Sequence, residues 1–421
     1  MPRHVAVIGA GVEGAASAVE LLRAGHRVTV IEPGEPGGPQ AASFGNAGWL
    51  SSHSVLPASA PGLWRKVPSF LRDPLGPLAV RWGYFPKVAP WLLRYLAAGS
   101  SEAKLLRIAQ SLRPLLKDSP VLHAALAREA GVPELIEHKG LMNAWHSRAG
   151  FEAEAMAWRI RKQVGISWTE IEGEALRAAE PDLDPAYTFA VLTEEAGRCL
   201  SPGRLVGALV AHAERRGATL RKAAATGFRL DGRALKAVIL ADGSAVECDA
   251  AVICCGARSA PLAAQLGDRV PLETERGYHV MLRGANRGPR HSISLGAAKM
   301  VVNPMEDGLR AAGQVEIAGL EGAPNWKRAE ILRDHLLRSF PGLPNPYPAE
   351  LVTTWLGHRP STPDGMPVIA PSTRCPEVIH AFGHGHVGLV AGPRTGRIVA
   401  QLLSGQSPEV SIAPFSPTRF R

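Results

Sequence analysis

The feature that most constrains this chain is a glycine motif between two short apolar runs at its N-terminus. The sequence opens 4-HVAVIGAGVEGAASAVELLRAGHRVTVIE-32, with an apolar run at 5–8 and a second at 28–31. Gly9, Gly11 and Gly14 form G-x-G-x-x-G between them, and Glu32 closes the second run. The order strand, glycine turn, helix, strand and acid predicts a βαβ unit that binds a dinucleotide.

Each part of this motif has a physical reason. Gly9 permits the tight turn, Gly11 lets the backbone approach a pyrophosphate, and Gly14 lets the helix lie close to the strand. The free N–H groups at the helix start attract phosphate. Glu32 can accept the ribose hydroxyls and would repel a 2′-phosphate, which disfavours NADP and leaves FAD or NAD. The predicted cofactor-binding set here is Gly9, Ala10, Gly11, Val12, Glu13, Gly14 and Glu32.

A second stretch, residues 224–260, distinguishes FAD from NAD. Asp231-Gly232 and Asp242-Gly243 are turn signals between short alternating runs, followed by an apolar run at 250–255 that ends at Gly256. A dehydrogenase that uses NAD normally continues with further βαβ units instead. The layout resembles the two-segment FAD site of flavoprotein oxidoreductases, with Thr226 and Gly256 as cofactor-binding candidates. A plain β-meander is the alternative interpretation.

A third stretch, 40-QAASFGNAGWLSS-52, is small and polar and follows the βαβ unit. A chain that runs flat along an aromatic ring system needs small side chains and free backbone donors. We therefore expect Ser43 to meet a phosphate and Asn46, Ala47 and Gly48 to meet the flavin ring. Without the other motifs, this stretch would be interpreted as an ordinary loop.

The ordered set of motifs resembles a known family, the FAD-dependent D-amino-acid dehydrogenases within the wider D-amino-acid, glycine and sarcosine oxidase group. The matching stretches are GAGVEG, SFGNAG, ERGYHV (275–280), GHRPSTPDGMPVI (357–369) and GHGHVGL (383–389). The resemblance implies an α/β fold, with a discontinuous Rossmann-like FAD-binding domain and an α+β substrate domain built on an antiparallel sheet. The expected boundaries are 1–56, 196–270 and 352–421 for the FAD domain, and 57–195 and 271–351 for the substrate domain.

The resemblance also implies site residues. The loop 383–388 would lie against the flavin, with Gly385, His386, Val387 and Gly388 as cofactor contacts, and a helix at about 389–403 would point its N-terminus at the flavin. Arg359 is the expected carboxylate anchor because a guanidinium can clamp a carboxylate with two hydrogen bonds; Arg276 is a rival. The predicted catalytic set is Arg359, Tyr278, His384 and His386. No metal is expected, because no third ligand has recognisable spacing.

Two residues depart from the pattern of the D-alanine-type members. Those members carry an aliphatic residue where this chain has His358, and a hydroxyl residue where it has His386. Additional polar groups there imply a substrate with a polar group of its own. A ring-hydroxylated D-proline fits, so the stretch also resembles the D-hydroxyproline dehydrogenases.

The implied reaction transfers a hydride from the Cα of a D-amino acid to FAD, and passes the electrons to a quinone-type acceptor. Two alternatives stay open at this point. One is an oxygen-dependent amine oxidase of the glycine or sarcosine type, and the other is a flavin-carrying relay subunit of a larger complex.

Composition narrows the partners and the location. The net charge of +9 is spread along the chain with no nucleic-acid-binding motif, so we expect no nucleic acid. Residues 61–100 hold seven of the 24 aromatic residues and six Lys or Arg with one acid, Asp73. This pattern suits peripheral contact with the inner face of a membrane, and inward packing is the alternative. No apolar run approaches a membrane span and the strand begins at once, so a cytoplasmic protein is expected.

Overall fold

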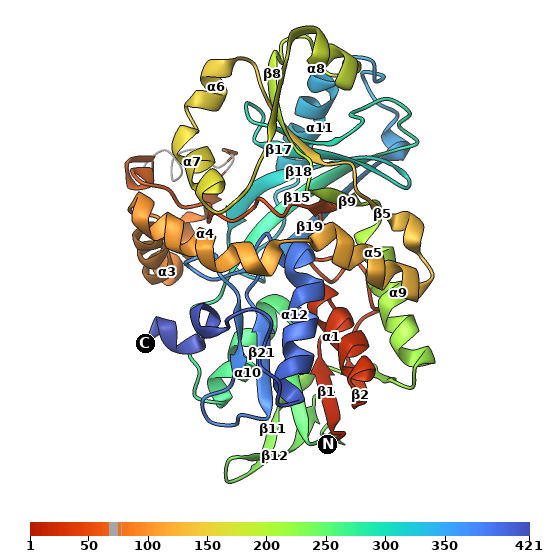
Figure 1. The fold of residues 1–421 in the computed structure, drawn as a ribbon, viewed down its shortest axis with the longest axis vertical. Coiled ribbons are helices and arrows are strands. Elements are labelled where there is room, and N and C mark those ends of the chain that lie inside the picture. Colours follow the sequence, from red (N-terminus) through yellow and green to blue (C-terminus); the bar gives the residue numbers. More distant parts are fainter. Residues whose placement is uncertain (67–74, 77) are drawn as a thin grey trace.

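The computed structural model describes residues 1–66, 75–76 and 78–421, and it has two parts (Figure 1). The lower part in Figure 1 holds both ends of the chain, a parallel sheet and the adjacent helices α1 and α12. The upper part is built on a larger sheet. This architecture confirms the predicted fold class, an α/β chain with a Rossmann-like part and an α+β part with a mainly antiparallel sheet.

The smaller sheet has six strands and is covered on both faces. In β1, Val5 and Val7 pack with helices α1, α9 and α12, whereas Ala6 and Ile8 pack with the three-stranded meander. A strand buried on both sides requires an unbroken apolar run, which is what the sequence carries. The strand order is β10 (Thr219–Arg221), β2 (Arg27–Ile31), β1 (His4–Ile8), β14 (Ala250–Ile253), β21 (Val378–Phe382) and antiparallel β20 (Val368–Pro371). The meander is β11 (Ala225–Asp231), β12 (Ala234–Leu240) and β13 (Ala245–Glu247).

The six strands come from three distant segments of the chain. β1 and β2 precede residue 56, β10 and β14 lie within 196–270, and β20 and β21 follow residue 352. Strand β19 (Val352–Ser361) differs, because it pairs with β15 (Glu273–Arg283) in the larger sheet. The start of the third segment, strand β19, is therefore hydrogen-bonded to the larger sheet, which is formed mainly by the segments expected to make the substrate domain.

The larger sheet has nine strands, mostly antiparallel, and α11 packs its buried leucines on one face. Its order is β19, β15, β18 (Gly308–Ile317), β17 (Met300–Met305), β16 (Ser292–Leu295), β6 (Leu141–Trp145), β8 (Phe189–Thr193) and β7 (Thr169–Glu172), with β4 (Leu78–Val80) beside β18. A small third sheet joins β3 (Trp49–Leu50), β9 (Gly197–Cys199) and β5 (Ile136–Glu137). Within the described residues, the α-helices are α1 (Val12–Arg23), α3 (Phe85–Ala98), α4 (Glu102–Leu116), α5 (Ser119–Ala130), α6 (Arg148–Glu152), α7 (Ala155–Gln163), α8 (Gly173–Ala179), α9 (Pro202–Arg215), α10 (Ser259–Gln265), α11 (Lys327–Ser339) and α12 (Gly388–Leu403).

Helices α1 and α12 lie side by side because glycines allow their backbones to approach (Figure 1). A Cβ on Gly396 would lie 2.7 Å from the Ala16 carbonyl carbon, and one on Gly392 would lie 2.8 Å from a methyl of Val12. Pro393 stands inside α12 without ending it. The N-termini of both helices consequently come together at one place, beside the glycine motif.

The aromatic stretch at 61–100 contains some residues that pack inward and others that are exposed, as membrane contact would require. Trp91 and Tyr95 on α3 stack at 5.1 Å and are buried, whereas Trp64 and Trp82 are mostly exposed. Residues 67–74 and 77, including Asp73, fall outside the described part. None of the helices in the described part is long and apolar enough to cross a bilayer.

Candidate active site

A cavity of about 880 Å³ lies between the two parts of the molecule. Its floor is formed where the parallel strands end, at Gly9 after β1, Glu32 after β2 and Cys254 after β14. The opposite wall is one face of β15 and β19. The carboxyl edge of a doubly wound sheet is where such folds bind ligands.

Glu32 marks one end of the cavity. Its Oε2 accepts a hydrogen bond from the Ala10 N–H at 2.8 Å, and its Oε1 accepts one from the Gly34 N–H at 3.1 Å. The carboxylate is held at the cavity wall, in the position predicted for contact with ribose hydroxyls. Ala224 and Ala225 line this end, but Thr226 does not, because its hydroxyl donates to the Ile239 carbonyl within the meander.

Glycine is present at each of the three motif positions for a different structural reason. Gly9 has φ +104°, and a Cβ there would lie 2.5 Å from the Cys254 carbonyl oxygen. A Cβ on Gly14 would lie 1.9 Å from the Gly9 carbonyl oxygen, so this glycine sets the distance between α1 and β1. A Cβ on Gly11 would meet nothing closer than the Ser43 hydroxyl at 3.6 Å. Only Gly11 therefore leaves open space toward the cavity.

The stretch after β2 forms part of the floor. The Ser43 hydroxyl accepts a hydrogen bond from the Val12 N–H at 3.1 Å, and Arg310 donates to the Asn46 carbonyl at 2.6 Å. Ser43, Asn46 and Ala47 line the cavity. Gly48 does not: it has φ +75° and packs against Cys199, where a Cβ would lie 2.2 Å from the carbonyl oxygen.

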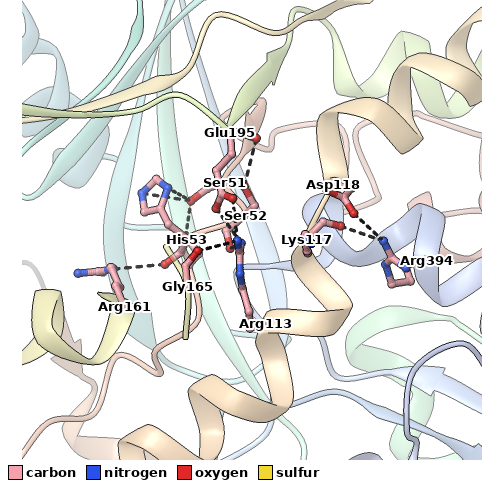
Figure 2. Close-up of polar contacts among 11 residues, drawn as sticks. Ser51, Ser52, His53, Arg113, Lys117, Asp118, Arg161, Gly165, Glu195 and Arg394 are labelled. Atoms are coloured by element: carbon pink, nitrogen blue, oxygen red, sulfur yellow. Dashed lines mark hydrogen bonds and ion pairs between the residues drawn. The ribbon is translucent and has the colours of Figure 1, made fainter. Parts of the chain in front are cut away.

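Behind this floor, an ion pair holds the turn at Ser51–Ser54 (Figure 2). Arg113 of α4 makes a bidentate pair with Glu195, both N···O distances being 2.7 Å, and also donates to the Ser52 carbonyl at 3.2 Å. Ser51 and Ser54 line the cavity and their hydroxyls lie 2.6 Å apart. The pair therefore connects a helix of the upper part to the wall of the cavity.

We expect Arg113→Met to lower stability and weaken cofactor retention together. The substitution keeps the apolar stem but leaves Glu195 and the Ser52 carbonyl without their donor, an effect of about 1–3 kcal/mol. A urea titration and the flavin-to-protein absorbance ratio measure the two effects. Arg159→Met is the control, because Arg159 makes only an exposed pair with Glu102 at 3.1 Å. Equal behaviour of the two variants would contradict the assigned role.

The wall opposite the floor carries a partly buried cation, Arg359. Glu275, Gly277 and Arg359 share one face of the β15–β19 pair, because Glu275 lies directly opposite Arg359 in the register. The guanidinium of Arg359 lies flat over Gly277, where a Cβ would be 2.4 Å from Cζ. It donates to the Gln314 carbonyl at 3.3 Å. Within the described residues, no carboxylate oxygen lies within 4.0 Å of it.

Burial sets the electrostatics of this wall. Desolvation lowers the pKa of Arg359, and the charge of Glu275 opposes that shift. Desolvation raises the pKa of Glu275, and the charge of Arg359 lowers it. Both side chains face the cavity. The wall therefore presents a cation and an acid on one surface, without a direct ion pair between them.

Tyr278 lines the cavity, but the structure directs its hydroxyl away from Arg359. Its side chain points to the other face of β15, where the hydroxyl donates to Glu316 at 2.7 Å and accepts from the Asn325 N–H at 2.9 Å. Arg276, the rival anchor, lies on that same face, fully buried, 3.5 Å from Glu316. Neither polar group is directed at the cavity, because successive residues of a strand point to opposite faces.

The C-terminal loop forms the end wall. His384, Gly385, His386 and Gly388 line the cavity, but Val387 is buried in a core cluster. The His386 side chain is open to the cavity, and desolvation by the walls lowers its pKa to about 4, with the charge of Arg359 as a second cause.

Two further histidines border the same space. His384 is 1% exposed, and desolvation lowers its pKa to about 3. His358 lines the cavity and its Nδ1 lies 2.9 Å from the Thr274 hydroxyl. In the described part of the chain, no group of three or more His, Cys, Asp or Glu could hold a metal ion.

The residues of this cavity fit FAD. An acid stands at one end, bare backbone lies at Gly11 beside the N-terminus of α1, and the small residues Ala42, Ser43 and Ala47 form the floor. The cavity extends from Glu32 to Arg359, so it accommodates a long dinucleotide with room for a substrate at the far end. Gly256 contributes to the wall beside Glu32, as predicted for a second cofactor segment.

Sequence reasoning missed three contributors to the site. Glu275 is part of the motif ERGYHV. Because side chains alternate along a strand, Glu275 shares a face with Gly277, two residues away, and this is the face of Arg359. Gly45 and Trp355 form a contact that needs the fold, because a Cβ on Gly45 would lie 2.0 Å from the Trp355 ring. No local signal joins residues 310 positions apart.

Comparison with known proteins gives a consistent family. The model of the DAO family, FAD dependent oxidoreductase, matches residues 4–402. A D-amino-acid oxidase of Bradyrhizobium diazoefficiens is 60% identical over 418 residues, 99% of each chain. A D-amino acid dehydrogenase of Methylobacterium radiotolerans is 31% identical over 97% of each chain. The crystal structure of glycine oxidase from Geobacillus kaustophilus superposes with a TM-score of 0.73 at 22% identity, covering 99% of each chain.

Proposed function

This chain belongs to the DAO family of FAD-dependent oxidoreductases, and from that premise we propose that it oxidises a small D-amino acid at the Cα–N bond. Its relatives at 60% and 31% identity are named for D-amino acids. FAD supplies the two-electron acceptor for the hydride that leaves Cα. The remaining work, which is to bind, orient and deprotonate the amino acid, belongs to the cavity walls.

The observation that carries this proposal is the unpaired guanidinium of Arg359 at the cavity wall. A partly buried cation without a counter-ion gains stability when an anion arrives, and a carboxylate fits the guanidinium with two parallel hydrogen bonds. Glu275, on the same face, is placed to meet the amino group. The cation and the acid together match the two charged groups of an amino acid.

Two groups at this wall can hold the amine proton. The substrate must lose it, because only the neutral amine has the lone pair that supports departure of the hydride. His386 is unprotonated at neutral pH since its pKa is lowered to about 4, and Glu275 faces the same space. The positive charge of Arg359 also lowers the pKa of an amine beside it.

We extend the proposal to a cyclic or ring-hydroxylated substrate of the D-proline type, and to His358 and His386 as its polar contacts. His386 lines the cavity within reach of the charge of Arg359 and is the main candidate. His358 also lines the cavity, but its side chain shares the Arg276 face of the strand pair and contacts Thr274. An anaerobic panel of D- and L-amino acids, including the prolines and hydroxyprolines, tests enantiomer and ring together. Bleaching of the flavin absorbance by L-amino acids alone, or by none of the panel, would reject the proposal.

The electron acceptor has two candidates. Resemblance to the dehydrogenases favours a quinone-type acceptor, whereas the 60% identical relative is named an oxidase, which favours oxygen. Turnover in air with peroxide detection, compared with anaerobic turnover with a soluble quinone, separates them. If a quinone is the acceptor, the exposed Trp64 and Trp82 and their basic neighbours Arg65, Lys66 and Arg81 provide a surface for a bilayer. Co-sedimentation with anionic vesicles tests that surface.

A further inference from the structure

One acidic residue of the glycine motif is not needed for the turn. Glu13 is the fifth residue of 9-GAGVEG-14 and lies in the first turn of α1. The free N–H groups of this turn attract the phosphates of a dinucleotide. A carboxylate facing the same cavity would repel them. Phosphate binding therefore does not explain why a glutamate occupies this position.

The contacts of Glu13 form a built site. Its side chain is 15% exposed, and its Oε1 lies 3.4 Å from Nδ1 of His384, which is 1% exposed. That Nδ1 has no hydrogen bond of good geometry, and Nε2 lies 3.1 Å from the Thr395 hydroxyl. A Cβ on Gly388 would lie 2.6 Å from the Glu13 Oε1, so glycine at the first residue of α12 leaves room for the carboxyl in this position.

No fixed cation neutralises the pair. Within the described residues, no Lys or Arg nitrogen lies within 4.0 Å of the Glu13 carboxylate. Desolvation raises the pKa of Glu13 to about 7 and lowers that of His384 to about 3. The first turn of α12 contributes no acid. The other titratable groups facing this region are His386 on the loop, His123 on α5, whose Nε2 lies 2.6 Å from the Leu389 carbonyl, Cys254 after β14 and Glu32 after β2.

We propose that Glu13 and His384 together hold one proton at the cavity wall, and that FAD binding is coupled to its retention. FAD carries negative charge on its diphosphate, which disfavours an ionised carboxylate beside it. Binding therefore removes the charge of Glu13 and takes up a proton wherever the free protein has lost it. The inference depends on the cofactor alone and not on which amine is oxidised.

The direction of the pH dependence follows from linkage. At a pH below the Glu13 pKa of about 7, Glu13 in the free protein is already neutral, so the affinity for FAD is at its maximum. Bound FAD raises the pKa of Glu13 further. The affinity for FAD therefore falls as the pH rises from the pKa of Glu13 in the free protein to its pKa in the complex. Across that interval the dissociation constant increases by about tenfold per pH unit.

The test uses the full chain freed of flavin and titrated with FAD from pH 6 to pH 9. Calorimetry in buffers of different ionisation enthalpy should show an uptake approaching one proton near pH 8. Glu13→Gln should bind FAD with little pH dependence and, above pH 8, more tightly than the unmodified chain. Glu20→Gln is the control, because Glu20 lies on the same helix, pairs with Arg23 and Arg397, and should keep the slope.

Two results would overturn the proposal. One is FAD binding to the unmodified chain without proton uptake between pH 7 and pH 9, a measurement that needs no variant. The other is a folded Glu13→Gln protein that keeps the full slope, which would transfer the effect to Glu32 or to another group.

Discussion

Replacing Arg359 with alanine is expected to raise KM for the amino acid by about 30-fold to a few thousand-fold. Removing one member of a buried, hydrogen-bonded charge pair weakens binding by about 2–5 kcal/mol. Among the described residues, the guanidinium has no carboxylate oxygen within 4.0 Å, so its loss falls on the substrate rather than on the fold. Steady-state kinetics measure the effect, and added guanidinium should restore part of the activity. An unchanged KM would remove Arg359 from the carboxylate site.

Tyr278→Phe is the matched comparison for this experiment, because the sequence placed Tyr278 in the same predicted catalytic set. Its hydroxyl contacts Glu316 and the Asn325 N–H, on the face of β15 that points away from Arg359. We expect the phenylalanine variant to melt at a lower temperature, since a hydrogen bond to a charged group contributes about 1.5–3 kcal/mol. Its KM should be unaltered. A KM that rises with Tyr278→Phe would return that hydroxyl to the substrate site.

Gly14→Ala is expected to abolish FAD binding by displacing α1. The new Cβ would lie 1.9 Å from the Gly9 carbonyl oxygen and 2.9 Å from its carbon, and neither atom belongs to a flexible side chain. Overpacking of this kind typically costs about 1–3 kcal/mol, and contact with backbone places this case at or above the upper limit. The purified protein should be colourless and should unfold at lower urea concentration. A yellow protein of normal stability would contradict the assigned packing.

Gly11→Ala separates packing from binding in the same motif. Here the added Cβ meets only the Ser43 hydroxyl at 3.6 Å and a Glu13 oxygen at 3.8 Å, which are ordinary contacts. The backbone at Gly11 has φ −68°, which alanine adopts freely. We therefore expect normal folding with weakened affinity for FAD, measured by flavin fluorescence. Loss of folding in this variant would remove the distinction between the two glycines.

Much of the smaller sheet could be predicted because its evidence is local. The runs at 5–8 and 28–31 form β1 and β2, and the two Asp-Gly turns define the meander, since each depends on a few neighbouring residues. Helices α4 and α5 are separated at Asp118, which has φ +63°. Pro120 lies in the first turn of α5, a position where proline is tolerated, so the sequence itself favours a helix start at this point.

The direction of side chains was harder to predict. Tyr278 and Glu275 occupy one strand, and a shift of one residue decides which of them faces the cavity. That register is set by pairing with β19 and β18, which lie more than 30 residues away in sequence. Gly48, Thr226 and Val387 do not line the cavity, although each is adjacent in sequence to a lining residue. Gly48 and Val387 are buried in the protein, whereas Thr226 is exposed on the surface of the meander.

Strand β19 has a consequence for how such enzymes diverge. The strand ends just after Arg359, the Gly385 N–H donates to the Pro360 carbonyl at 2.8 Å, and Ser361 bridges to His384. A single stretch of about 30 residues thus fixes the spacing between Arg359, the proposed substrate anchor, and the loop at the end wall. Other cavity-lining residues, such as Met300 on β17 and Ala312 and Gln314 on β18, lie outside that stretch. Descendants of this chain can therefore acquire new substrates by substitution at these positions while inheriting the same reactive geometry.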